Sequence, residues 1–190
     1  MRKVISFHHA SLDGCLSGPN GEMDWIIFDE QIQEYAAEVH STADTVLYGR
    51  ATYEMMAGFW PKLPESLQGS GYHVEQARWL DNATKIVCST TLTEVDWINS
   101  KVIKDHIPEE LAALKREKGK DMIVIGSASL SHYLIQNNLI DEYRINVNPV
   151  VLGAGVPLFE NISHRVDLKL VEAIPFKSGV VSLVYQGKAH

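Results

Sequence analysis

Two short apolar runs in this chain stop at a glycine, pass through small hydroxylated residues and continue with helical periodicity. They are Thr45–Glu54 (TVLYGRATYE) and Met122–Leu130 (MIVIGSASL). A buried strand that ends in this way leads into a helix whose first backbone N–H groups point at an anion, typically a phosphate. Two such turns predict a ligand with more than one phosphate group, and Arg50 supplies a cation beside the first turn.

A third expected strand ends in the hydroxylated loop Ser89-Thr90-Thr91. Either glycine turn alone could simply end a strand. The three loops together favour a dinucleotide, because ligands of open α/β sheets bind beyond the carboxyl ends of the strands. The chain has no GxGxxG after its first strand and no GxxxxGK(S/T) loop, so it lacks the Rossmann fingerprint, and an ATPase of the P-loop kind is excluded.

The turn Ser11-Leu12-Asp13-Gly14 follows the first expected strand and therefore shares the same rim. An Asp-Gly turn needs no function, so a purely structural role stays open beside a catalytic one. His8 and His9 are adjacent and face opposite sides of a strand, so they cannot bind one metal ion together. Each could line a pocket or pack in the core. No HExxH or similar spacing occurs, and we expect no metal site.

The composition is that of an ordinary globular protein. The 190 residues are 45% hydrophobic and 22% charged, which fits one domain spanning 1–190. The net charge of −7 argues against a nucleic-acid or anionic-membrane partner. No run approaches a membrane span of about 20 apolar residues. Cys15 and Cys88 lie far apart, which is typical of reduced thiols in a cytoplasmic protein.

Strands and helices are expected to alternate along most of the chain. We expect strands at 4–10, 45–48, 85–88, 122–125 and 143–152, the last interrupted by Pro149 at an edge or bulge, and helices at 28–41, 51–57, 73–81, 108–118 and 129–136. An antiparallel hairpin at 167–173 and 180–186 ends the chain. This order predicts an α/β fold with a mostly parallel central sheet, helices on both faces and an antiparallel C-terminal edge.

Five motifs in this order resemble the dihydrofolate-reductase superfamily. They are SLDG, YGRATYE followed by FWP, CSTTL, IGSASL and DEYRINVNPVVLGAGVPLF. Within that superfamily the chain is most similar to the reductase domain of the riboflavin-biosynthesis deaminase–reductase and to its stand-alone homologues. The resemblance implies a single three-layer dihydrofolate-reductase-like domain, NADPH as hydride donor, a small pyrimidine- or pteridine-type substrate and a homodimer made by the C-terminal strands.

The resemblance also implies which residues bind the cofactor. Gly49, Arg50 and Thr52 would hold the adenosine 2′-phosphate and the pyrophosphate, and Ser89 and Thr90 would lie along the adenosine. Gly126, Ser127, Ala128, Ser129 and Leu130 would cradle the pyrophosphate, and the loop Gly153 to Phe159 would close near the cofactor. The proton that accompanies the hydride could come from water or from a carboxylate, with Asp13 as the candidate.

Three positions depart from the riboflavin enzymes and their close homologues. Cys15 stands where the enzymes commonly have Lys, Val124 where they have an acidic residue, and Thr90 where stand-alone homologues often have Arg. Recognition of the 2′-phosphate therefore depends mainly on Arg50. Three alternatives stay open: dihydrofolate reductase proper, a non-catalytic binder of NADP(H) or a metabolite, and a flavin protein.

Overall fold

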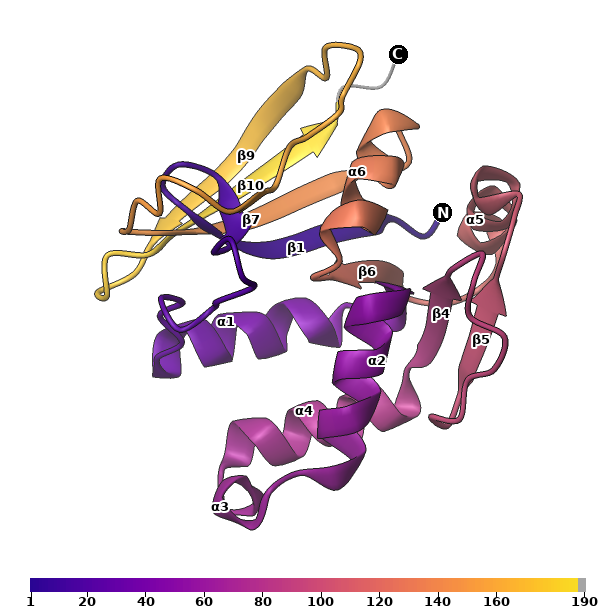
Figure 1. The fold of residues 1–190 in the computed structure, drawn as a ribbon, viewed down its shortest axis with the longest axis horizontal. Helices are drawn as coiled ribbons and strands as arrows, with labels where there is room; N and C mark the ends of the chain where they lie inside the picture. The colour runs from indigo at the N-terminus through magenta and orange to yellow at the C-terminus, as the bar shows by residue number, and fades with distance from the viewer. Residues whose placement is uncertain (188–190) are drawn as a thin grey trace. The chain divides into compact units, whose positions relative to one another are not determined.

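The structure is a computed structural model that describes residues 1–187 (Figure 1). The chain divides into two compact units, which are described separately. The first contains Met1–Arg2 and Gln33–Ile123, and the second contains Lys3–Ile32 and the chain from Val124 onward.

The strands of the first unit are parallel where their register is defined. β3 (Ala43–Gly49) pairs in parallel with β4 (Thr84–Cys88), and β4 pairs in parallel with β5 (Ser100–Ile103). β6 (Asp121–Ile125) neighbours β3 on its other side. The helices are most of α1 (Glu30–Ser41), then α2 (Arg50–Phe59), the 3₁₀ turn η1 (Trp60–Lys62), α3 (Glu65–Gln68), α4 (Gly71–Asn82) and α5 (Ile107–Arg116).

Continuous apolar runs explain why β3 and β4 form the core of this unit. Val46, Leu47, Ile86 and Val87 have no exposed surface, so side chains on both faces of these strands are covered, as expected for parallel strands. Helix α5 has Pro108 in its first turn and two glutamates there, and it ends with Lys115 and Arg116. This charge order suits the helix dipole, as the sequence predicted.

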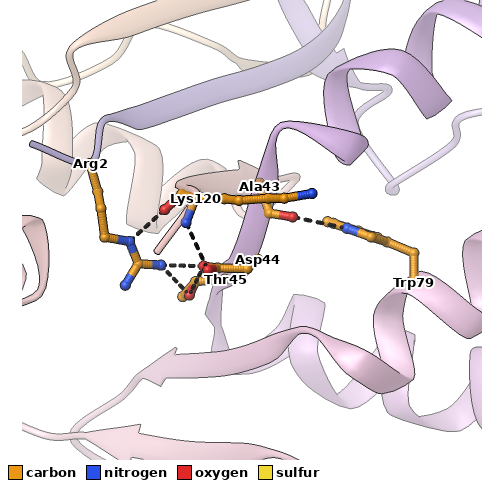
Figure 2. A network of polar contacts seen from close by, with 6 residues as sticks. All are labelled: Arg2, Ala43, Asp44, Thr45, Trp79 and Lys120. Atoms are coloured by element: carbon orange, nitrogen blue, oxygen red, sulfur yellow. Dashed lines mark hydrogen bonds and ion pairs between the residues drawn. The ribbon is translucent and has the colours of Figure 1, made fainter. Parts of the chain in front are cut away.

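A partly buried polar network fixes the N-terminus within the first unit (Figure 2). The Arg2 guanidinium donates to the carboxylate of Asp44, to Thr45 Oγ1 at 2.6 Å and to the carbonyl oxygen of Lys120. The second carboxylate oxygen of Asp44 accepts the backbone N–H of Lys120 at 2.8 Å. The Arg2 side chain is only 6% exposed, and these partners satisfy its buried charge.

The second unit contains parallel and antiparallel pairs. β1 (Val4–Ser11) runs parallel to β7 (Glu142–Asn148), and β10 (Val181–Gly187) runs antiparallel between β7 and β9 (Leu168–Pro175) (Figure 1). β2 (Cys15–Ser17) and β8 (Val156–Pro157) form a small antiparallel pair. The helix of this unit is α6 (Ala128–Gln136).

These pairings confirm the predicted fold class: an α/β fold with mostly parallel strands and an antiparallel C-terminal edge. The expected strand 143–152 was wrong in extent. β7 stops at Asn148, because Pro149 has no N–H for a ladder bond, and β7 lies between β1 and β10 rather than at an edge. The single domain 1–190 stays a prediction.

Within residues 1–187, every helix is too short or too polar to cross a lipid bilayer.

Candidate functional site

Two predicted loops meet at the carboxyl ends of β3 and β4. Gly49, the last residue of β3, is in register with Cys88, the last residue of β4. Arg50 Nη1 donates a hydrogen bond to Thr91 Oγ1 at 3.2 Å, and Arg50 Nε lies 3.5 Å from Glu54 Oε1 on the next helical turn. The Arg50 side chain is 53% exposed, so its guanidinium is accessible to a ligand.

Helix α2 starts directly at this rim. Its N-cap is Gly49, which has no side chain to cap the first-turn N–H groups. Uncapped N–H groups at a helix start favour an anion, because they carry the positive end of the helix dipole. Thr52, the third residue of α2 and part of its first turn, is 9% exposed.

The loop after β4 is braced by a serine. Ser89 Oγ accepts the backbone N–H groups of Thr91 at 3.2 Å and of Leu92 at 3.0 Å, while Thr90 is exposed. Ser89 therefore shapes the loop. The residue of this loop that contacts Arg50 is Thr91, which was not among the predicted cofactor-binding residues. Burial raises the pKa of the neighbouring Cys88 thiol to about 11, so this thiol stays protonated near neutral pH.

The remaining predicted cofactor residues belong to the second unit. Gly126 and Ser127 both have φ of +63°, and α6 begins immediately after them without a side-chain cap. A left-handed serine is strained, and such strain concentrates at ligand-binding turns. Ala128 is half-buried, Ser129 is exposed and Leu130 is buried in the core, so Leu130 can offer a ligand only its backbone.

Asp13 fixes the loop that follows β7. Its carboxylate accepts the Ser11 hydroxyl at 2.6 Å and the backbone N–H groups of Leu152 at 3.1 Å and Gly153 at 2.8 Å. These hydrogen bonds, that of Ser11 first, lower the pKa of Asp13 to about 2. A carboxyl group with this pKa is ionised at neutral pH, so it holds no proton that it could donate to a substrate.

His8 is a packed core histidine. It is 3% exposed, and its Nε2 lies 3.0 Å from the Ser131 hydroxyl. Burial, with smaller contributions from His9 and His132, lowers the pKa of His8 to about 3, so its ring is neutral. Across the described residues, 1–187, no three His, Cys, Asp or Glu side chains gather in a metal-binding arrangement.

The sequence reasoning missed a polar face on β7. Glu142, Arg144, Asn146 and Asn148 alternate with apolar residues along a strand that lies between two others. The strict alternation in EYRINVN was the available signal, because it assigns one whole face of the strand to polar side chains.

A family model described as the RibD C-terminal domain matches residues 2–182. The chain belongs to the RibD C-terminal domain family. Its relatives include the uncharacterised protein YyaP of Bacillus subtilis (strain 168), which is 37% identical over 187 residues, or 97% of this chain and 94% of YyaP.

Solved structures share the fold of this RibD C-terminal domain protein. A protein assigned to riboflavin biosynthesis from Shewanella sp. PV-4 superposes with a TM-score of 0.78 at 23% identity, covering 98% of this chain and 99% of that one. Dihydrofolate reductase from Enterococcus faecalis, complexed with NADP(H), gives a TM-score of 0.64 at 16% identity, with 98% and 97% covered. Membership of the RibD C-terminal domain family supports a reductase, and the fold is that of a dihydrofolate reductase.

Proposed function

We propose that this protein is an NADPH-dependent reductase that transfers a hydride to a pyrimidine- or pteridine-type substrate, like 5-amino-6-(5-phosphoribosylamino)uracil reductase of riboflavin biosynthesis. One observation carries the proposal. Arg50 stands half-exposed against Thr91 where the ends of β3 and β4 meet, at the uncapped start of α2. Ligands of open α/β sheets bind beyond the carboxyl ends of the strands, and the N-terminus of a helix there favours a phosphate.

The residues of the first unit suit the adenosine end of NADPH. In the proposal, Arg50 pairs with the 2′-phosphate, Gly49 and Thr52 hold phosphate oxygens at the helix start, and Ser89 and Thr90 line the adenosine. A guanidinium pairs with a phosphate through two parallel hydrogen bonds, which a neutral side chain cannot do. Within residues 1–187, Arg50 interacts with Glu54 and Thr91, and both of these partners are exposed enough to release it.

The residues of the second unit suit the pyrophosphate. The two left-handed residues Gly126 and Ser127 leave the start of α6 without a side-chain cap, and Ala128, Ser129 and Leu130 follow with first-turn N–H groups. We assign these five residues to the pyrophosphate. When bound, NADPH supplies the hydride, and the chain's own work is to place donor and acceptor together.

The proton that accompanies the hydride is assigned to water, one of the two predicted sources. The other predicted source, the Asp13 carboxyl group, has a pKa of about 2 and therefore carries no proton to donate at neutral pH. Asp13 then acts on the reaction by holding Leu152 and Gly153 in place, next to the loop expected to close near the cofactor.

We further propose a cytoplasmic homodimer. Cys15 and Cys88 are free thiols, as is usual for proteins of a reducing compartment. β9 pairs only with β10 among the described strands, and Leu170 and Val171 on it are 50% and 52% exposed. An exposed apolar edge strand offers unpaired backbone groups with which the edge strand of a second copy can pair. The molar mass in solution tests this, and a monomer at micromolar concentration would contradict it.

The experiment for the proposed activity follows NADPH oxidation by its absorbance during incubation with reduced pterins, dihydrofolate and aminouracil ribosides. Steady consumption that depends on one of these compounds supports a reductase. Binding of NADPH without turnover of any panel member would contradict it and support the non-catalytic binder, for which Cys15 and Val124 are the sequence evidence. Turnover of dihydrofolate alone would instead indicate dihydrofolate reductase proper.

A further inference from the structure

The buried polar face of β7 carries two asparagines in different situations. Asn146 and Asn148 follow one another on the same face, and neither has any exposed surface. The opposite face carries Tyr143 and Ile145, which pack in the core. Two buried carboxamides two residues apart therefore provide an internal comparison.

Asn148 has its hydrogen bonds satisfied by the protein. Its Oδ1 accepts the backbone N–H of Ile27 at 2.9 Å, and its Nδ2 donates to the carbonyl oxygens of Asn146 at 3.1 Å and Ala10 at 3.4 Å. This side chain ties β7 to β1 and to the segment before α1.

Asn146 has no such partners. Throughout residues 1–187, neither its Nδ2 nor its Oδ1 finds a hydrogen-bond partner. Buried side-chain polar atoms are almost always paired, and a group left unpaired destabilises the fold. A whole carboxamide kept at this position needs a compensating reason, and ligand binding is one.

The neighbours of Asn146 suit a flat polar ring. His9 on β1 and Ser182 on β10 are in register with Asn146, so the three side chains form a row across the sheet. The His9 ring meets Phe7 and Phe28 edge-on, with centroids 5.9 and 5.7 Å apart. Polar groups in a row beside aromatic rings are typical of a site for a heterocycle.

We propose that Asn146 binds the lactam edge of the heterocyclic substrate. Its Nδ2 donates to the ring carbonyl and its Oδ1 accepts from the adjacent ring N–H, which satisfies both orphaned atoms at once. The substrate class is thereby narrowed to rings with a carbonyl beside an N–H, as in uracils and pterins. The inference rests on the proposed function, because the reductase substrate is the ligand in question.

Entry of such a ring requires the irregular segment 18–29 to move. This segment contains neither helix nor strand, and it contacts the neighbours of Asn146 through the Ile27–Asn148 hydrogen bond and the Phe28–His9 ring contact. Because this segment contributes no strand to the β-sheet, its displacement leaves the strand ladder intact.

The first test uses the wild-type protein and two matched probes. Uracil has the lactam edge, and 1,3-dimethyluracil has the same ring without N–H groups. The inference predicts that uracil shifts the side-chain amide NMR signals of Asn146 and that dimethyluracil does not. Equal responses to both probes, or no response to uracil at millimolar concentration, would overturn it. This test contains no NADPH, so its result does not depend on whether the proposal about the cofactor is correct.

The second test compares Asn146→Leu with Asn148→Leu, which have the same change of volume and burial. Asn146→Leu is expected to melt at or above the wild-type temperature and to weaken uracil binding at least about tenfold, since it removes a carboxamide that only the ligand pairs with. Asn148→Leu is expected to lower the melting temperature, because it breaks internal bonds. An Asn146→Leu protein that keeps uracil affinity, or melts as low as Asn148→Leu, would contradict the inference.

Discussion

At the scale of single residues, Lys85 is the least expected feature of the first unit. It has no exposed surface, and its Nζ donates to the carbonyl oxygens of Leu80 at 2.5 Å and Ala83 at 2.9 Å, at the end of α4. The same Nζ lies 4.6 Å from the centre of the Trp97 ring. Burial lowers the pKa of Lys85 to about 8, against an opposing effect of Asp81, so the amine is largely charged at neutral pH.

Replacement of this amine should cost stability. Lys85→Met leaves two buried carbonyl oxygens without a donor, and we expect it to lower the free energy of unfolding by about 1–3 kcal/mol. Urea denaturation measures this. Lys101→Met, an exposed lysine on the neighbouring strand β5, is the control and should change little. Equal effects of the two substitutions would contradict a capping role for Lys85.

The substitution Asp13→Asn distinguishes the two roles considered for Asp13: positioning of the loop after β7 and delivery of the proton. Asp13→Asn removes one of the two carboxylate oxygens that accept the Leu152 and Gly153 N–H groups. If the role of Asp13 is to position this loop, the substitution should raise KM and lower the melting temperature. The shape of the pH–rate profile should not change, because a pKa of about 2 lies below the working range. Loss of turnover together with one limb of that profile would show that Asp13 delivers the proton after all.

Sequence reasoning reached some of these residues and not others. Arg50 could be proposed as a cofactor ligand because a cation after a strand-ending glycine is visible in the sequence. The Asn146 carboxamide and the Lys85 amine were not, since their importance depends on which atoms surround them after folding. A residue type indicates what a side chain can bind, whereas only the fold shows whether its partners are present.

At the scale of elements, the continuously apolar strands and the helix with charged ends were predictable. The observed β3, β4 and α5 agree with the predicted elements, because continuous burial and helix-end charges both leave local patterns in the sequence. β2, β5 and β8 were missed, because strands of three, four and two residues carry too little pattern. The predicted extent of β7 was too long, because the apolar residues after Pro149 continue the apolar sequence pattern but make no further hydrogen bonds of the β-sheet.

The turn before α6 gives an element-scale prediction. Gly126 has φ of +63°, a conformation that strains residues with a Cβ. Gly126→Ala should therefore reduce the free energy of unfolding by about 1–2 kcal/mol. Gly69→Ala is the control, because Gly69 has φ of −85° and open space around it. Thermal or urea unfolding of both variants measures the difference, and a neutral Gly126→Ala would show that the turn tolerates a side chain.

At the scale of the whole molecule, acid should destabilise the fold before most carboxylates titrate. Burial lowers the pKa of His8 to about 3 and that of His40 to about 4. His40 stacks on Trp79 and its Nδ1 lies 2.7 Å from Gln76 Oε1, which only partly offsets burial. Between pH 6.5 and pH 4 the unfolded chain thus binds more protons than the native protein, so stability falls as the pH falls.

The expected loss at pH 5 is about 2 kcal/mol for each histidine. Urea unfolding at pH 7 and pH 5 measures it, and His40→Leu should remove about half of the difference whatever its effect at pH 7. A His40→Leu protein with the wild-type pH dependence would show that His40 does not titrate differently in the native and unfolded states.

The most direct test of the account is a fluorescence titration with NADPH and with NADH, on the wild-type protein and on Arg50→Ala. We expect tighter binding of NADPH by the wild type. Loss of a charged hydrogen-bonding partner should weaken NADPH by about 1.5–3 kcal/mol and leave NADH nearly unchanged. Arg78→Ala, an exposed arginine on α4, should bind both coenzymes like the wild type. Equal losses for NADPH and NADH in Arg50→Ala, or no loss for either, would contradict the account.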